Sequence, residues 1–385
     1  MDAALRGVRV IDFTTTIAGP HCGRLLADLG AEVIKIEAPE GDMMRTRPPL
    51  RHGASTSFGQ LNAGKKSVVL DLKSPGGVAA ARRLVATADV VVENFRPGVM
   101  QRFGLDYAAL KEVKPDLVYC AISGYGQTGP SAALPAYAPV IHAASGYDLA
   151  HLAHQEEPRR PDYCGIFIAD VLAGTYAFGA IMTALYRRQL TGEGQMIDVS
   201  MLESMLSLTL SEIQAAQFAV TPPGRPIFGP IVTSDGYIML AVASERTFQN
   251  TAMASGNPGW IEDPRFADYL ERRRHWGELV AELEEWSKTL TTAEVQAIFD
   301  RHGVPSSPYR TVREAMADPQ LAHRAAFTEI ADAGGSFLAL NPPFRFSAAT
   351  AAAQPFAARL GEHTEAVLAE LDYGAEEIAA LNERG

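Results

Sequence analysis

Short apolar runs alternate with helical stretches through the first third of the chain, and this alternation constrains the fold most. The runs are GVRVIDF, EVIKIE, SVVLDL, ADVVVENF and DLVYCAIS. Each has the length and the branched residues of a buried strand. The first intervening stretch places Leu25, Leu26 and Leu29 on one helical face. Strands separated by helices form βαβ units. We therefore predict an α/β fold built on a parallel sheet.

The later sequence predicts long helices and then a change of character. A buried helix is expected over about 166–188, because its sequence is strongly apolar, and another helix is expected over 202–218. The Pro- and Gly-rich stretch TPPGRPIFGP, at 221–230, has the composition of a linker. Beyond it, residues 245–303 are helical and richly charged, which is typical of a small separate domain.

Composition argues against several classes of protein. The formal net charge of −11 disfavours a nucleic-acid or membrane-surface binder, since both need a cationic face. The N-terminus lacks the pattern of a secretory signal, and no run reaches the ~18 apolar residues that span a bilayer. Cys22, Cys120 and Cys164 are widely spaced, which indicates buried, reduced thiols of a cytoplasmic protein. The nine histidines lack metal-ligand spacing, and we predict no metal.

Asp170 is the most distinctive charged residue, since no other lies between Asp162 and Arg187. An ionised carboxylate is costly to bury without a partner, so this residue must be paired, protonated or used in chemistry. Spacing alone leaves two readings open: a helix N-cap or satisfied core aspartate, and a functional group.

Loops at the expected strand ends form a second candidate feature. They are Thr14–Pro20, Leu70–Lys73 and Glu93–Gly98, with Arg102 and Phe103 just beyond. Carboxyl ends of parallel strands share one edge, where ligands of such sheets bind. Amides, cations and phenylalanines gathered there suit a ligand with phosphates and an aromatic base. Each loop taken singly is equally typical of ordinary turn chemistry.

Two further motifs do not support the chemistry they first indicate. Gly124–Gly129 matches G-x-G-x-x-G, but Pro130 and a loop-like segment follow where a dinucleotide fingerprint needs a helix. We therefore reject NAD or FAD binding and expect a glycine loop near the mouth of a site. No G-x-S-x-G elbow exists around Ser123 or Ser145, so a serine nucleophile is disfavoured.

Together these segments resemble the class III CoA-transferases, also called the CaiB/BaiF or formyl-CoA transferase-like family. The resemblance runs nearly end to end. It rests on VIDFTTTIAGPHCGRLLADLGAEVIKIEAPEGD, GKKSVVLDLKSPGG, VENFRPGVMQRFGLDY, AISGYGQTGP, ALYRRQLTGEGQMIDVSMLES and LGEHTEAVLAELDY. Asp170 falls where the family keeps its catalytic aspartate, on the helix before the TGxGQ turn.

The resemblance implies an organisation and a set of contacts. It implies a Rossmann-like large domain over 1–224, a smaller α+β domain over 225–320, and a segment 321–385 that returns to the large domain. It also implies a homodimer whose chains interlock, with coenzyme A as a cosubstrate and no permanently bound cofactor. The implied CoA contacts are Ile17, Ala18, Leu70, Lys73, Asn94, Phe95, Arg102, Phe103 and Tyr137. Amides of Thr16, Ile17 and Ala18 are the candidates to stabilise an oxyanion.

The implied mechanism is nucleophilic catalysis by Asp170, through an acyl anhydride and then an aspartyl–CoA thioester. We expect succinyl-CoA and a small dicarboxylate as the substrate pair. Alternatives are a 2-methylacyl-CoA racemase of the same family and a silent acyl-CoA-binding protein. For the racemase, Glu245 lies close to, but offset from, the position of one base, and Tyr137 stands where the other base would be a histidine. The chain departs from the family at Ala38, where relatives carry a basic residue that Arg45 or Arg47 would replace, and at Ala138 beside Tyr137. His142, Tyr147, His151 and His154 are candidates for the acyl pocket or simply for its wall.

Overall fold

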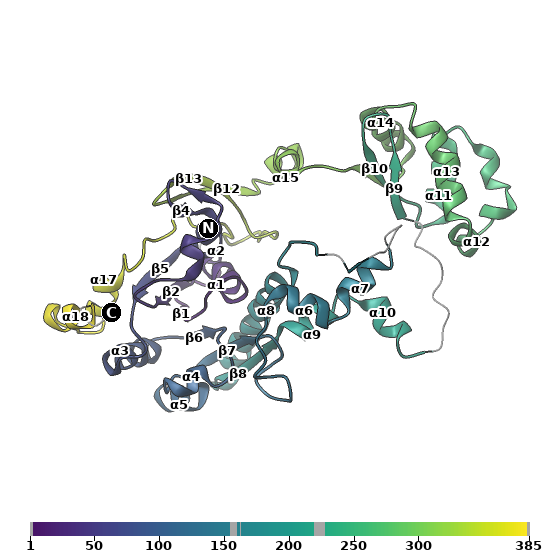
Figure 1. Ribbon diagram of the computed structural model, residues 1–385. Helices are drawn as coiled ribbons and strands as arrows, with labels where there is room; N and C mark the ends of the chain where they lie inside the picture. The colour runs from purple at the N-terminus through teal and green to yellow at the C-terminus, as the bar shows by residue number, and fades with distance from the viewer. Residues whose placement is uncertain (1–2, 155–159, 162, 219–227, 383–385) are drawn as a thin grey trace. The chain divides into compact units, whose positions relative to one another are not determined.

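The computed structural model describes residues 3–154, 160–161, 163–218 and 228–382 (Figure 1). These divide into two compact units, each considered by itself. Unit 1 comprises Met1–Ile213 and Gln320–Gly385, and unit 2 comprises Gln214–Pro319. The domain boundary expected between 224 and 225 lies outside the described residues.

Unit 1 is built on a six-stranded parallel sheet of order β5-β2-β1-β6-β7-β8. Its strands are β5 (Lys65–Val69), β2 (Glu32–Glu37), β1 (Arg9–Asp12), β6 (Val90–Glu93), β7 (Val118–Ser123) and β8 (Gln195–Ser200). The parallel register, with Val10 beside Val33 and Val90, confirms the α/β fold predicted from the alternating runs. From β1 the sheet continues through β2 and β5 on one side and through β6, β7 and β8 on the other. The strand order therefore reverses between β1 and β6, and the loops after these two strands diverge and leave a crevice.

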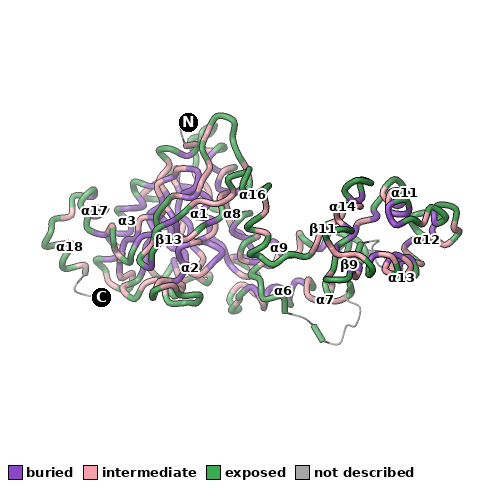
Figure 2. Tube along the Cα trace, turned by 90° about the horizontal axis from the view of Figure 1, so that it is seen from above, coloured by how far each residue is buried: buried purple, intermediate pink, exposed green. Residues whose placement is uncertain are grey.

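Helices cover both faces of this sheet because alternate strand residues point to opposite sides. Val10, Val92 and Cys120 share one core with α1 (Ala18–Asp28), α6 (Ala138–Ala144) and α8 (Ile168–Thr191). Ile11, Val91 and Tyr119 share the other core with α3 (Pro75–Ala86), α5 (Tyr107–Val113) and α17 (Thr364–Ala369). In both units the buried residues gather inside and exposed ones outside (Figure 2). The remaining helices of unit 1 are α2 (Thr56–Asn62), α4 (Val99–Arg102), α7 (Tyr147–Leu152), α9 (Met201–Leu206), α10 (Leu210–Ala215, which ends just inside unit 2), α16 (Pro319–His323, which begins at the last residue of unit 2) and α18 (Ala375–Asn382).

The C-terminal segment packs against the sheet edge at β5. The backbone N–H of His363 donates to Ser67, and that of Val69 donates to the hydroxyl of Thr364. Two small antiparallel ladders complete unit 1: β3 (Leu50–Arg51) with β4 (Ala54–Ser55), and β12 (Phe327–Asp332) with β13 (Gly335–Leu340). A short 3-10 helix spans Met43–Thr46.

Unit 2 has its own core around a three-stranded antiparallel sheet, with Ile238, Phe248 and Phe299 fully enclosed. The strands are β9 (Phe228–Val232), β10 (Tyr237–Ala241) and β11 (Ser306–Pro308). The helices are α11 (Glu245–Ala254), α12 (Tyr269–Arg274), α13 (Trp276–Ser287), α14 (Thr292–His302) and α15 (Val312–Met316), with 3-10 turns at Pro258–Ile261 and Pro264–Phe266. A smaller α+β fold is therefore present, as the charged helical stretch predicted.

Helix α8 differs from the expected buried helix over 166–188. It runs from Ile168 to Thr191, and only one side is buried: a stripe of mostly small residues such as Ala173 and Ala177, with Ile181 and Leu185. Tyr186 and Leu190 on its other side are 65% and 70% exposed. By length and composition alone α8 could cross a membrane, although its small-residue stripe packs on α1 within unit 1.

Two other expectations change. The helix expected over 202–218 is two helices, α9 and α10, because the hydroxyls of Ser207 and Thr209 donate back to backbone carbonyls at the break. All three cysteines are free, but Cys164 is exposed, unlike the buried Cys22 and Cys120.

Candidate active site

The carboxyl ends of the parallel strands carry the loops that the sequence singled out. Two cavities lie at this edge of the sheet. Both are lined by Thr15, from the loop after β1, and by Phe95, from the loop after β6. The two cavities therefore adjoin at these residues.

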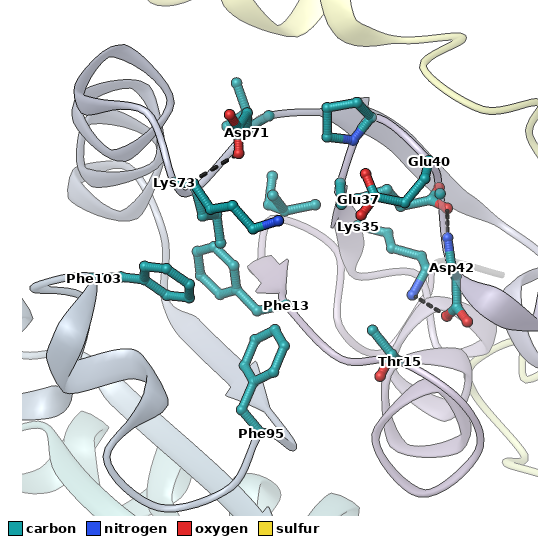
Figure 3. Close-up of a pocket in the computed structure, with 16 residues that line it drawn as sticks. Phe13, Thr15, Lys35, Glu37, Glu40, Asp42, Asp71, Lys73, Phe95 and Phe103 are labelled. Atoms are coloured by element: carbon teal, nitrogen blue, oxygen red, sulfur yellow. Dashed lines mark hydrogen bonds and ion pairs between the residues drawn. The ribbon is translucent and has the colours of Figure 1, made fainter. Parts of the chain in front are cut away.

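The first cavity, here called the aromatic pocket, has a volume of about 210 Å³. Phe13, Phe95 and Phe103 line it together, and the ammonium group of Lys73 extends into it (Figure 3). Its other lining residues are Thr15, Lys35, Ile36, Glu37, Ala38, Pro39, Glu40, Gly41, Asp42, Leu70, Asp71 and Leu72. Flat rings beside an exposed cation suit a planar base and an anionic group, as the loops predicted.

The second cavity, here called the aspartate pocket, has a volume of about 310 Å³ and is lined by Asp170. Its other lining residues are Thr15, Thr16, Ala18, Met43, Asn94, Phe95, Arg96, Pro97, Ile122, Ser123, Gly124, Ala132, Leu134, Ala136, Tyr137 and Met201. Arg96 is the one lysine or arginine in this lining. Residues predicted from widely separated segments thus meet around one carboxylate.

Asp170 lies in the first turn of α8, but it does not cap the helix. The N-cap residue is Phe167, which makes no side-chain cap bond. Burial raises the pKa of Asp170 to about 6, while hydrogen bonds from the backbone of Ala18 and from its own amide act in the opposite direction. No lysine or arginine in the described part of the chain lies within ion-pair distance of this carboxylate. The capping reading is therefore excluded, and a half-buried, unpaired carboxyl group remains.

The loop Thr14–Thr16 presents the amide of Ala18 to Asp170, and side chains hold its backbone. Asp12 Oδ1 accepts from the N–H of Thr14 at 2.8 Å, and Lys35 Nζ donates to the Thr14 carbonyl at 2.6 Å. The side-chain amide of Asn94 accepts from the N–H and donates to the carbonyl of Thr15, both at 2.8 Å. The N–H of Thr16 donates to Asp42 at 3.4 Å.

This loop is strained and close to α8. Thr16 has a φ of 70°, which is unfavourable for a β-branched residue and persists only where the surroundings enforce it. A Cβ on Gly174 would lie 2.4 Å from the carbonyl oxygen of Ala18, so glycine is required where α8 crosses the start of α1. The residues that follow the loop therefore pack closely against the helix that carries Asp170.

Behind the loop lies a buried cluster of opposite charges. Lys65 Nζ is 2.8 Å from Asp12 Oδ2, and Lys35 Nζ is 3.0 Å from Asp42 Oδ2. All four groups are at most 3% exposed. Burial opposes ionisation of Asp12, but Lys65 and Lys35 outweigh it and lower its pKa. This charge cluster of Asp12, Lys35, Asp42 and Lys65 is neutral in sum.

Some of the predicted site residues lie outside both pockets or are already bound to other protein groups. Arg102, at the end of α4, is exposed and lines neither pocket. Arg45 is bound to both carboxylate oxygens of Glu37, so it does not replace a basic residue at Ala38. Among the oxyanion candidates, the amides of Thr16 and Ala18 already have acceptors, whereas that of Ile17 has none among the described residues.

The candidate histidines His142, His151 and His154 lie outside the linings of both pockets. His142 is 1% exposed, and its Nε2 accepts the N–H of Ala169 at 3.2 Å. His151 stacks on Tyr147 with ring centroids 6.2 Å apart. His154 is exposed at the end of the same segment. Neither cavity has any of these three in its lining.

The glycine loop and Ser123 complete the site. No helix begins between Gly124 and Tyr137, all of which are described, so the G-x-G-x-x-G match lacks the helix that dinucleotide binding needs. Gly124 instead lines the aspartate pocket. Ser123, at the end of β7, lines it too, although sequence reasoning set it aside for lacking an elbow motif. Its place at the last residue of the strand DLVYCAIS was the signal that could have identified it.

Comparisons with known proteins agree with this geometry. The model of CoA-transferase family III matches residues 5–364. Succinate–glutarate CoA-transferase of Agrobacterium fabrum is 34% identical, with 96% of each chain covered. Succinyl-CoA–D-citramalate CoA-transferase of Chloroflexus aurantiacus is 34% identical, covering 95% of this chain and 94% of that one.

A crystal structure of a CaiB/BaiF family protein from Brucella suis has a TM-score of 0.84 and 35% identity, covering 97% of this chain and 100% of that one. Full-length similarity in sequence and in fold confirms the resemblance seen in the motifs. The chain belongs to CoA-transferase family III and is a CoA-transferase.

Proposed function

We propose that the protein transfers CoA from succinyl-CoA to a small carboxylic acid through covalent intermediates on Asp170. The observation that carries this proposal is the unpaired carboxylate of Asp170 in a cavity beside the amide of Ala18. A pKa of about 6 leaves it mostly ionised at neutral pH and more basic than an exposed aspartate. Such a group can attack a thioester.

The exchange proceeds in four balanced steps. The carboxylate attacks the thioester carbonyl of the donor, the C–S bond breaks, and CoA leaves as thiolate from an aspartyl–acyl anhydride. The thiolate attacks the aspartyl carbonyl and releases the donor acid, leaving an aspartyl–CoA thioester. The acceptor carboxylate displaces thiolate to form a second anhydride. The thiolate attacks the acceptor acyl carbonyl, so the new acyl-CoA forms and the carboxylate is restored.

The two pockets divide the CoA ester between them in this proposal. The adenine and phosphates occupy the aromatic pocket against Phe103 and Lys73, with Leu70 beneath. The pantetheine arm passes Phe95 and Asn94 to the thioester beside Asp170, with Ala18, Ile17 and Tyr137 around it. The shared lining by Thr15 and Phe95 supports this path. Arg102 would contact phosphate from outside the pocket.

A dicarboxylic substrate fits the charge of the aspartate pocket. Arg96, the one cationic side chain of its lining, is exposed and has no acceptor among the described residues. A guanidinium there would bind the remote carboxylate of succinate, glutarate or a similar acid. The names of the relatives from Agrobacterium and Chloroflexus include substrates of this class.

We extend the proposal to assembly and location. The exposed apolar side of α8, with Tyr176, Tyr186 and Leu190, supports an interlocked homodimer that buries it. The domains would then be 1–224 with 321–385, and 225–320. The protein would act in the cytoplasm, without nucleic acid, membrane or permanent cofactor. Light scattering would test the dimer and cell fractionation the location, and a monomer or membrane-bound enzyme would contradict the respective part.

Mass spectrometry after incubation with succinyl-CoA and hydroxylamine tests the mechanism. An acylated or thioester-linked aspartate reacts with hydroxylamine, so a hydroxamate at residue 170 is expected. A racemase would instead exchange the α-proton of a 2-methylacyl-CoA in deuterated water without any acceptor acid. Glu245, its expected second base, pairs with Arg272 at 2.8 Å in unit 2. A silent binding protein would give neither product.

A further inference from the structure

The proposed chemistry needs more hydrogen-bond donors than the loop after β1 supplies. Each of its steps passes through a tetrahedral oxyanion, first on the substrate carbonyl and then on the carbonyl of Asp170. Preorganised donors aimed at such oxygens account for much of catalysis in acyl transfer. The N–H of Thr16 donates to Asp42 and that of Ala18 to Asp170 itself. In the described residues this leaves the amide of Ile17 as the one uncommitted donor of the three.

Ser123 offers a donor from a different strand at the same edge of the sheet. It is the last residue of β7, where the strand ends at the edge of the sheet that carries the other loops. Ser123 is among the residues that line the aspartate pocket, together with Thr15, Ala18 and Asp170. The strand, and not a loop, fixes its position, because β7 is paired with both β6 and β8.

The hydroxyl of Ser123 is buried and has no partner. The residue is 7% exposed, and its Oγ makes no hydrogen bond among the described residues. Buried hydroxyls are normally satisfied, because loss of hydration is otherwise uncompensated. Other buried serines here follow that rule: Ser204 Oγ donates to the carbonyl of Ser200 at 2.8 Å, and Ser145 Oγ to that of His142 at 2.9 Å.

The neighbours of Ser123 explain why no internal acceptor satisfies it. The adjoining lining residues Ile122, Gly124 and Ala136 bring no polar side chain. A Cβ on Gly124 would lie 2.3 Å from that of Ala136, so the backbone packs tightly beside Ser123. The hydroxyl without a partner thus belongs to a residue that lines the same cavity as the proposed nucleophile, Asp170.

We propose that Ser123 is a catalytic residue whose Oγ–H donates to the oxyanion formed in the aspartate pocket. The inference rests on the proposed function of Asp170. It assigns to Ser123 a hydrogen bond that is stronger in the transition state than with the neutral thioester, because the acceptor oxygen gains charge there. The proton stays on Oγ throughout, so the step needs no further acid or base.

The test compares Ser123→Ala with the matched control Ser204→Ala, which removes an equally buried hydroxyl outside both pockets. Steady-state transfer from succinyl-CoA should lose about 100- to 1,000-fold in kcat in Ser123→Ala, with KM changed less than about threefold. The rate of hydroxamate formation at Asp170 should fall by the same factor. Ser204→Ala should retain wild-type rates, and thermal unfolding should show both variants folded.

A conservative replacement separates hydrogen bonding from packing. Ser123→Thr keeps the hydroxyl and should recover to within about tenfold of the wild-type kcat. Equal losses in the Thr and Ala variants would assign the effect to packing and overturn the proposal. So would a Ser123→Ala protein within about threefold of wild-type kcat, or one that loses only KM. A wild-type protein without any adduct at Asp170 would refute the proposed function instead.

Discussion

Two carboxylates of unit 1 are removed from solvent but differ in their surroundings. Asp12, at the end of β1, is 0% exposed and lies 2.8 Å from Lys65. Asp170, at the start of α8, is half-buried and has backbone amides beside it but no cation among the described residues. The pKa of Asp12 is lowered and that of Asp170 is raised to about 6. Burial raises both, and only the paired lysines reverse its effect at Asp12.

The difference separates a structural carboxylate from a reactive one. A carboxylate locked between cations is stable and a poor nucleophile, since attack would leave those cations buried and unpaired. A carboxylate with raised pKa is held in a less stable ionised form, which favours bond formation with an electrophile. The charge cluster therefore supports the loop, and Asp170 is left free to react.

Removal of the free carboxylate should have the largest effect. Asp170→Asn should lower CoA transfer at least about a thousandfold, because the amide cannot form the anhydride. The fold should persist, since no ion pair is broken. Steady-state assays, thermal unfolding and hydroxylamine trapping would measure this. A variant that still transfers CoA within tenfold of wild type contradicts the assignment.

Breaking the paired carboxylate should instead cost stability. Lys65→Met leaves Asp12 buried without its nearest cation, so unfolding free energy should fall by about 3–5 kcal/mol. Lys66→Met is the matched control: its side chain is 31% exposed beside Glu32, and the expected loss is under about 1 kcal/mol. Denaturant melts at neutral pH would measure both. Equal losses of unfolding free energy in the two variants would show that the buried ion pair of the charge cluster stabilises the fold no more than an exposed ion pair does.

The sequence predicts the fold better than the electrostatics of the site. The alternation of apolar runs with helical stretches was sufficient to predict the parallel sheet, because the residues of each run identify it as a strand without knowledge of the rest of the chain. The strand-end loops also placed Phe95 and Lys73 at one edge, and the family resemblance named Asp170 as the catalytic residue. The pairing of Lys65 with Asp12 depends on which strands are neighbours in the sheet, and no local pattern encodes that order. Ser123 was missed for the same reason, since its lack of a partner is a property of surrounding segments.

The limits of α8 and of the helix after β8 show a second kind of difficulty. Apolar composition predicted a wholly buried α8, yet Tyr186 and Leu190 are exposed. Composition reports that a side chain is apolar, but not which neighbour covers it. The break between α9 and α10 depends on Ser207 and Thr209 donating back to the chain, which propensity averages do not resolve.

The pH dependence sharpens the comparison further. Only ionised Asp170 attacks, so kcat/KM for succinyl-CoA should fall about tenfold per unit as pH drops below about 6. The folded pKa lies above the ordinary value of 3.8, so the stability contributed by the protonated group is complete below about pH 4 and is lost as pH rises through about 6. Asp170→Asn should thus gain stability over wild type at about pH 8 and not at about pH 4. A gain of equal size at both pH values would contradict the raised pKa.

The smallest effect on activity is expected where the nucleotide part of the CoA ester binds, far from the thioester. The ammonium group of Lys73 extends into the aromatic pocket, and its side chain makes no ion pair within the described residues (Figure 3). Lys73→Ala should raise KM for succinyl-CoA about tenfold and leave kcat nearly unchanged, since a phosphate contact binds ground and transition states alike. Succinyl-pantetheine, which lacks the nucleotide, should show no difference between this variant and wild type. Lys111→Ala, at an exposed lysine on α5 outside both pockets, is the control. An equal rise in KM for both substrates would place the nucleotide outside the aromatic pocket, and Asp170 would then be served by a CoA ester bound along another path.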